Sequence, residues 1–312
     1  MPETGKMLVK PVAMTWKQHS GLSAEIRAKV SPPENRWTQW LGETPKVCVE
    51  KANEINSGTK KRLGCETPEL STLEVFYDDA PSSWLFCFCG SGMEGGFTEQ
   101  RLIDDFGRLP VVMRQHIRHL MGFPIENRPP SATAWALPTA DIILWGLDFD
   151  LMLHEAAHIL DNKHKFSSAG SFRKALENDA CLPSPYASQK INVTAEVWAE
   201  TFTVRRYQVE IVEKGKNPES TIDLSCMSQQ LDVIRNDTDD ILAADHKPEY
   251  CVRKDIDGDG AECCDNPHLV EGKWNCDTIN SNPSLEQLSS MEPFITFYDP
   301  VIENDGADDK RS

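Results

Sequence analysis

The segment that most constrains this chain is residues 150–161, Asp-Leu-Met-Leu-His-Glu-Ala-Ala-His-Ile-Leu-Asp, which contains an H-E-x-x-H pattern. On an α-helix, residues four apart lie one above the other, so His154 and His158 present two imidazoles to one point. Their separation suits a tetrahedral zinc ion. Glu155, one step round the helix, is placed to take a proton from a water molecule that the metal activates. The segment therefore predicts a helix with one metal-binding face.

The surroundings of the motif favour this interpretation over a chance match. Apolar residues recur at the helical spacing on the opposite side and can be buried: Leu153, Ala156, Ala157 and Leu160. Either Asp148 or Asp150 can cap the start of the helix. Residues 140–146 indicate a short buried strand just before it, and a strand followed by an H-E-x-x-H helix is the order of the zincin architecture. The alternative is a buried helix whose histidines are hydrogen-bonded core residues.

A catalytic zinc site needs a third protein ligand, and Glu196 is the preferred candidate. It lies on a predicted helix over residues 192–212, with Glu200 four residues further on the same face. One carboxylate of such a pair can bind the metal while the other accepts the N–H of a ligand histidine. The reverse assignment, with Glu200 as the ligand, remains open, as does a solvated helix face.

His164 is the second candidate for the third ligand. Residues 154–164 have the metzincin spacing H-E-x-x-H-x-x-G-x-x-H, except that Asp161 stands in place of the glycine. That glycine lets the chain turn sharply so that the third histidine reaches back, and Asp adopts such backbone angles less readily. Asp161 itself is expected to support the site or to cap the end of the helix.

Composition and charge exclude several classes of partner. The chain has 312 residues, 39% of them hydrophobic, which is enough for one large or two modest globular domains. Its net charge of -17 disfavours binding to nucleic acid and to anionic membrane surfaces, because both repel such a field. No apolar run approaches the ~20 residues of a membrane span. The sequence does not indicate an oligomeric state.

The ten cysteines predict an oxidising compartment. Their even number and wide spacing suit five disulfides, and the absence of paired C-x-x-C units disfavours zinc binding by thiolates. Residues 1–21 contain no proper signal peptide, since Lys10 and Pro11 interrupt the apolar stretches. The cysteines are the stronger signal, so a secreted protein is expected.

Patterning along the chain predicts three parts. Residues 1–45 are expected to be an irregular lead-in with one short helix near 24–30, and residues 46–245 a zincin-like catalytic domain. That domain should contain a disulfide-closed loop carrying Cys48 and Cys65, with His116 and His119 on the polar surface of a packing helix. Its predicted strands are 73–77, 84–89 and 140–146, and its predicted helices are 98–106, 110–121, 192–212 and 219–243.

Residues 246–312 differ from the rest in being rich in Cys and Asp and poor in aliphatic side chains. They are expected to be mostly irregular, with a disordered end. Asp255, Asp257 and Asp259 match the start of a calcium loop, D-x-D-x-D-G, although the twelfth position holds Asn266 instead of Glu. A calcium site is one reading of this segment, and an acidic turn is the other.

With these residues in place, the chain resembles the fungal conidiation-specific, lethal-factor-like zinc metallopeptidases, to which the anthrax toxin lethal factor is distantly related. The resemblance covers residues 70–215 and runs through residues 153–161, 177–181 and 195–200. It implies an α+β zincin fold and a zinc ion held by His154, His158 and Glu196. Members of that group are usually exported, which the sequence here matches in its cysteines but not in its first residues.

These patterns together predict a secreted zinc-dependent endopeptidase acting on a peptide or protein substrate. Glu155 would pass a proton from water to the leaving amine, and Tyr186 would donate a hydrogen bond to the developing oxyanion. The strand near residues 142–145 could pair with an extended substrate backbone. The alternative function is a non-catalytic secreted or spore-associated interaction protein that retains the fold.

Overall fold

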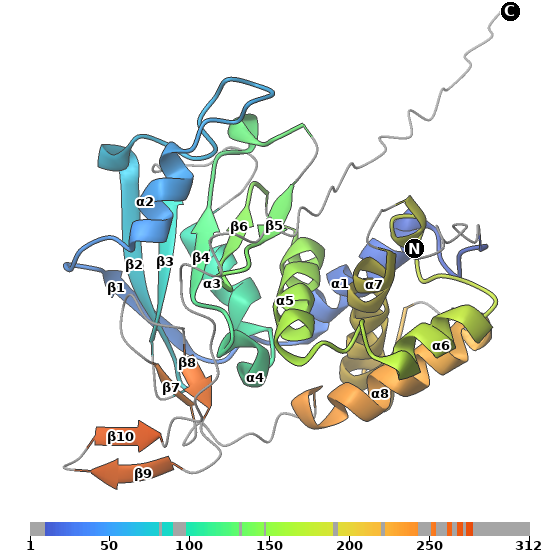
Figure 1. Ribbon diagram of the computed structural model, residues 1–312. Helices are drawn as coiled ribbons and strands as arrows, with labels where there is room; N and C mark the ends of the chain where they lie inside the picture. The colour runs from blue at the N-terminus through green and yellow to red at the C-terminus, as the bar shows by residue number, and fades with distance from the viewer. Residues whose placement is uncertain are drawn as a thin grey trace, which may run out of the picture.

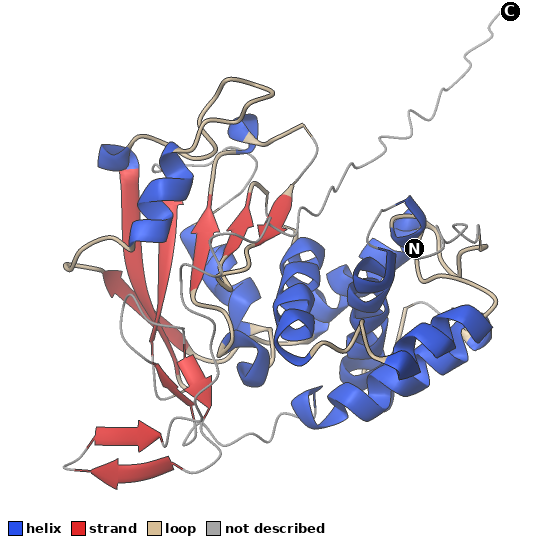
Figure 2. Cartoon of the chain, in the orientation of Figure 1, coloured by secondary structure: helices blue, strands red, loops and turns tan. Residues whose placement is uncertain are grey.

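The structure is a computed structural model that describes residues 10–80, 83–89, 98–130, 133–146, 148–189, 193–219 and 222–242. It also describes the backbone of four short segments, 251–253, 261–263, 267–270 and 273–276. A six-stranded mixed sheet lies beside a group of helices (Figures 1 and 2), which confirms the predicted α+β class.

The sheet has the strand order β1-β2-β3-β4-β6-β5. Its strands are β1 (Asn35–Gln39), β2 (Leu70–Tyr77), β3 (Ser83–Cys89), β4 (His119–Gly122), β5 (Ala134–Ala136) and β6 (Ile142–Leu144). The pairs β1–β2, β2–β3 and β5–β6 are antiparallel, whereas β3–β4 and β4–β6 are parallel. Because β6 is paired on both sides, it cannot take an added substrate strand, and the prediction that residues 142–145 do so is wrong.

Helices α1 (Trp16–Lys29), α5 (Phe149–His164), α6 (Gly170–Asn178), α7 (Val193–Tyr207) and α8 (Ser228–Leu242) lie together beside the sheet, and α2 (Lys46–Asn53) lies over β2 and β3 (Figure 1). Helix α5 packs on β5 and β6, and α1 and α7 pack on α5. Helices α6 and α8 pack against each other and on α7. The remaining helices of the described part are α3 (Glu99–Gly107) and α4 (Val111–Arg114), and a π-helical turn, Gln208–Glu213, extends α7.

Strand β3 separates two hydrophobic cores through its alternating side chains. Successive residues of a strand point to opposite faces. Trp84, Phe86 and Phe88 accordingly enter the large core beneath the helices, and Cys87 and Cys89 enter a smaller core that includes α2. All seven residues of β3 are buried, as expected of a strand covered on both faces.

Three disulfides join the six cysteines between residues 10 and 242, which confirms the prediction of disulfide bonding. Cys48 bonds to Cys87 and Cys65 bonds to Cys89, so the expected loop closure between Cys48 and Cys65 is wrong. Both links tie the segment around α2 to one face of β3, because alternate strand residues present their Sγ atoms on the same side. The third bond, Cys181–Cys226, joins the loop after α6 to the turn before α8.

Two other segments differ from the sequence expectation. Residues 110–121 are not one helix: α4 ends at Arg114, and His119 begins strand β4 between β3 and β6. A short apolar run that is buried all round has no period to distinguish helix from strand, and here pairing with two neighbours decided it. Residues 10–45 are also more regular than expected, since they supply α1 and the edge strand β1.

The predicted tail contains two antiparallel strand pairs, β7 (Cys251–Arg253) with β8 (Ala261–Cys263) and β9 (Pro267–Val270) with β10 (Lys273–Cys276). Asp255, Asp257 and Asp259, the expected calcium ligands, lie outside the described residues. No helix among the described residues is long and apolar enough to cross a membrane.

Candidate metal centre

Helix α5 positions the H-E-x-x-H residues because both of its ends are capped and its sides are covered. Asp148 accepts a hydrogen bond from the backbone of Asp150 at the start of the helix. Lys165 ends it in a left-handed conformation, with φ of 62°, and its N–H donates to the carbonyl of Asp161. Residues 149–161 are all buried, including the histidines and Glu155, so their side chains are held by packing on every side.

His154, His158 and Glu196 meet at one point between α5 and α7. The Nε2 atom of His158 lies 3.0 Å from Nε2 of His154. The Oε2 atom of Glu196 lies 3.2 Å from His154 Nε2 and 3.3 Å from His158 Nε2. These three are the group of metal-ligating side chains that the described residues bring together. Donor atoms 42 and 38 residues apart in the chain thus form a triangle with nearly equal sides.

The dimensions of this triangle suit a small cation. A tetrahedral ion with bonds of about 2.0–2.1 Å places its ligand atoms about 3.3–3.4 Å apart. The observed sides of 3.0, 3.2 and 3.3 Å are within a few tenths of that separation. One carboxylate and two imidazoles also form one of the ligand sets that catalytic zinc uses, with a fourth position left for water. The residues therefore fit a zinc ion in both chemistry and size.

Glu200 lies behind the triangle. Its Oε1 atom is 2.9 Å from Nδ1 of His154, on the side of the ring away from Glu196. Its Oε2 accepts a hydrogen bond from Ser184. Glu200 therefore holds the ring of His154, in the position of a carboxylate that orients a ligand histidine. Glu196 thus lies in the triangle and Glu200 lies behind it, which is the arrangement that the sequence favoured over the reverse.

The contact with Glu200 sets which ring nitrogen of His154 carries the proton. When Nδ1 donates to Glu200, Nε2 of a neutral ring has a lone pair, and that lone pair faces the Glu196 carboxylate. Two acceptors at 3.2 Å repel each other unless a cation lies between them. The arrangement thus requires positive charge at the triangle, supplied either by a proton or by a metal ion.

The electrostatics of the buried groups point the same way. Burial lowers the pKa of His154, but hydrogen bonds and charge interactions with Glu196 and Glu200 outweigh it and raise the pKa well above its usual value. Burial raises the pKa of Glu196, whereas the two histidines lower it more strongly, so that its carboxyl group is ionised. The negative charge of Glu196 and Glu200 beside His154 therefore favours a positive charge at this point of the site.

Glu155 and Tyr186 lie beside the triangle. Glu155 is 1% exposed and follows His154 on α5. The ring of Tyr186, from the loop before α7, meets the ring of His154 edge to face at 5.6 Å. Burial raises the pKa of Tyr186, and the charges of Glu196, Glu155 and Glu200 raise it further, so the phenol keeps its proton and remains a donor.

His19 is a member of this network that the sequence reasoning missed. It lies on α1, is fully buried, and its Nε2 is 3.2 Å from the backbone oxygen of Glu200 and 3.5 Å from its Oε2. Its Nδ1 lies 3.9 Å from Asp150, which also accepts from Ser23. Burial lowers the pKa of His19, but Glu200 and Asp150 raise it to about 9. A buried imidazolium therefore joins the first helix to the rear of the site.

A local signal could have located the helix that carries His19, although not its role. Thr15 and Gln18 form a capping box in which each side chain bonds to the backbone of the other. The T-x-x-Q pattern is visible in the sequence, but the buried face of α1 includes His19, Ser23 and Glu25, so it has no clear apolar stripe.

His164 is not part of the triangle. Its ring stacks on Phe166 at 5.0 Å and meets His116 edge to face at 5.8 Å, one and a half turns beyond His158 on α5. His119 is also elsewhere: it is buried, and its Nδ1 lies 2.7 Å from Asp141. The expectation that His116 and His119 share a polar helix surface is wrong, because the chain enters the sheet between them.

Comparisons of the chain with family models, with curated proteins and with solved structures found no match.

Proposed function

We propose that this protein is a zinc-dependent peptidase of the zincin type, and that it acts outside the cell. The observation that carries the proposal is the triangle of His154, His158 and Glu196, with sides of 3.0–3.3 Å. The peptide bond as the target comes from the resemblance of residues 70–215 to lethal-factor-like metallopeptidases. The disulfides support an oxidising compartment.

Zinc bound at the triangle would supply a Lewis acid that polarises a carbonyl group and makes water more acidic. Glu155, adjacent to His154 in a buried site, takes a proton from water and passes it to the leaving amine. Tyr186 keeps its proton at neutral pH, because burial raises its pKa, and donates a hydrogen bond to oxygen as negative charge develops there.

Glu200 and His19 act on the site indirectly. Glu200 accepts from Nδ1 of His154, so a neutral ring carries its proton on Nδ1 and directs the lone pair of Nε2 at the triangle. His19 lies behind Glu200, with its Nε2 atom 3.5 Å from Oε2 of Glu200, and when protonated it pairs with that carboxylate. The site is thus orientated by residues from three helices, α1, α5 and α7.

Metal analysis of protein produced in an oxidising host tests the proposal. We expect one zinc per chain, hydrolysis of casein or of a broad peptide library, and loss of that hydrolysis with a chelator. Glu155→Gln should retain zinc and lose hydrolysis, because the side chain keeps its size but cannot accept the proton. Protein that binds no zinc at the triangle is incompatible with the proposal.

The second candidate is a binding protein that keeps the fold without catalysis. Bound zinc without turnover of any member of the library would favour it. The presence of Glu155 next to His154, buried and beside Tyr186, favours the enzyme, because a metal site that serves only structure has no need of a nearby proton acceptor.

A further inference from the structure

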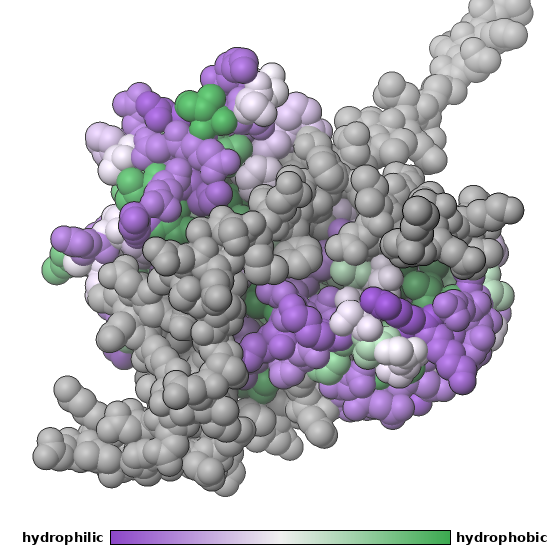
Figure 3. Space-filling model, viewed as in Figure 1, coloured by the Kyte–Doolittle hydropathy of each residue, from purple (hydrophilic) through white to green (hydrophobic). Residues whose placement is uncertain are grey.

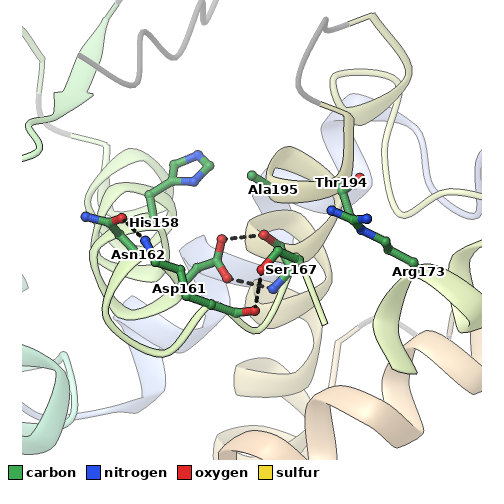
Figure 4. A pocket seen from close by; sticks show the side chains of 9 residues that line it. His158, Asp161, Asn162, Ser167, Arg173, Thr194 and Ala195 are labelled. Atoms are coloured by element: carbon green, nitrogen blue, oxygen red, sulfur yellow. Dashed lines mark hydrogen bonds between the residues drawn. The ribbon is translucent and has the colours of Figure 1, made fainter. Parts of the chain in front are cut away.

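A small pocket adjoins the metal triangle on the side of His158. It has a volume of about 210 Å³ and is lined from the end of α5 by His158, Asp161 and Lys165, from α6 by Arg173, and from the first turn of α7 by Thr194 and Ala195. Figure 4 shows the side chains of His158 and Arg173 on opposite sides of this space. A group held here lies beside a proposed metal ligand.

The side chains that line the pocket carry more positive than negative charge, although the protein as a whole is strongly acidic. Lys165 and Arg173 face it, whereas the chain as a whole carries a net charge of -17. The one carboxylate in the lining, Asp161, is 7% exposed, and its two oxygens accept from the backbone N–H of Ser167 at 2.7 Å and from its hydroxyl at 2.6 Å. Both oxygens of Asp161 are therefore engaged in holding the Ser167 loop (Figure 4).

Arg173 is available to a ligand. It is exposed, and among the described residues no hydrogen bond or ion pair engages its guanidinium group. Lys165, by contrast, already has one partner, because its Nζ donates to Asn162 at 2.7 Å. Two further N–H groups of the ammonium remain. Hydrophilic side chains cover the lower right of the molecule, where α6 and α8 lie (Figure 3), so an open arginine there is readily reached by solutes.

The pocket is small for a whole ligand. Pockets that enclose a drug-sized molecule measure about 300–1,000 Å³. A volume of about 210 Å³ suits one side chain or one chain end, with the rest of the ligand outside. An arginine with a planar fork of donors is the residue best matched to a carboxylate.

We propose that this pocket binds a carboxylate group of the peptide substrate, so that Arg173 selects acidic peptides. The inference rests on the proposed peptidase function, since it names the substrate class of the same site. A carboxylate can belong to an Asp or Glu side chain or to the end of a peptide chain, and both would meet Arg173 through the same hydrogen bonds.

A binding experiment tests the proposal without catalysis. Dye-labelled alanine hexapeptides carry one Glu or one Gln at the fourth position, each with a free or an amidated carboxyl end. Their binding to Glu155→Gln protein, or to chelator-treated wild type if that variant does not fold, is measured by fluorescence anisotropy. Arg173→Ala is compared with Lys174→Ala, which removes the same charge from the next exposed position on α6 but does not line the pocket.

The expected result is about tenfold tighter binding of the Glu peptide than of the Gln peptide, as for a hydrogen-bonded charge. Arg173→Ala should reduce that ratio to about twofold or less, and Lys174→Ala should leave it unchanged. A preference for Glu over Gln among the amidated peptides assigns the pocket to a side-chain carboxylate. A preference for free over amidated ends, with Glu and Gln equal, assigns it to the chain terminus, and Arg173→Ala should then remove that preference instead.

Equal binding of all four peptides, including no detectable binding of any, would overturn the proposal. So would equal effects of Arg173→Ala and Lys174→Ala. This failure is distinct from failure of the peptidase proposal, because binding is measured on protein that cannot turn over. Absence of zinc or of hydrolysis would remove the catalytic role while leaving selective binding by Arg173 intact.

Discussion

Replacing Glu200 by Gln should weaken zinc binding, although Glu200 supplies none of the three atoms that form the triangle. Its Oε1 is 2.9 Å from Nδ1 of His154, and that contact sets the proton on Nδ1 and directs Nε2 to the triangle. The amide oxygen of Gln can still accept this bond, but the negative charge that makes His154 a stronger ligand is lost. Its NH₂ group must also face Ser184 in place of a carboxylate oxygen.

Removal of a group that orients a metal ligand lowers metal affinity about 10–100-fold. That range corresponds to about 1.4–2.8 kcal/mol of binding free energy. We expect the loss of zinc affinity in Glu200→Gln to fall in this range. The loss in Glu196→Gln should be larger, because Glu196 supplies an atom of the triangle. Glu177→Gln, at an exposed position of α6, is the matched control and should bind zinc like the wild type.

Competition with a zinc-binding dye at fixed pH measures the four affinities, and circular dichroism shows whether each variant keeps its helices. The ordering expected is wild type and Glu177→Gln together, then Glu200→Gln, then Glu196→Gln. A folded Glu200→Gln protein with wild-type affinity would refute the role given to Glu200. A greater loss for Glu200→Gln than for Glu196→Gln would exchange their roles.

Three further predictions concern stability. Because the pKa of His19 is raised to about 9 from its ordinary 6.5, its contribution is complete below about pH 6.5 and is lost as the pH rises through about 9. In chelator, the difference in unfolding free energy between wild type and His19→Gln should shrink by about 3 kcal/mol from pH 6 to pH 10, and a constant difference would contradict the assignment. The double variant Cys48→Ala, Cys87→Ala removes a disulfide that spans a sequence separation of 39. Its free energy of unfolding, measured in urea, should fall by about 4 kcal/mol, and an unchanged value would show that the bond is absent in solution. Trp198 is fully buried and stacks at 5.5 Å on Phe166, so Trp198→Ala should lower the free energy of unfolding by about 3–5 kcal/mol. A decrease below about 1 kcal/mol would show that the core under α7 is not packed as described.

Much of the helix that carries the site could be read from local pattern. The H-E-x-x-H spacing, the preceding apolar strand and the capping aspartate are properties of neighbouring residues, and they correctly predicted α5 after β6. The same holds for β2, α3 and α7, whose periods of 2 or 3.6 appear directly in the sequence, and for β3, which is a short apolar run of strand length. The i, i+4 spacing of Glu196 and Glu200 on one helix likewise follows from local geometry.

What local pattern could not supply is the identity of partners far apart in the chain. His19 meets Glu200 across 181 residues, and nothing in the segments around either residue specifies that contact. Strand β4 was mistaken for helix because its apolar residues are buried from both faces, and only its pairing with β3 and β6 makes it a strand.

The sequence by itself therefore determined which side chains can form the site, because residue type and helical spacing are set along the chain. Tertiary structure decided which of them do. Packing of α7 against α5 brought Glu196 to the two histidines and left His164 on Phe166. The alternation of β3 directed Cys87 and Cys89 to partners near α2. Burial supplies the physical reason: charged groups removed from water must find compensating partners, and only the folded chain determines which ones lie within reach.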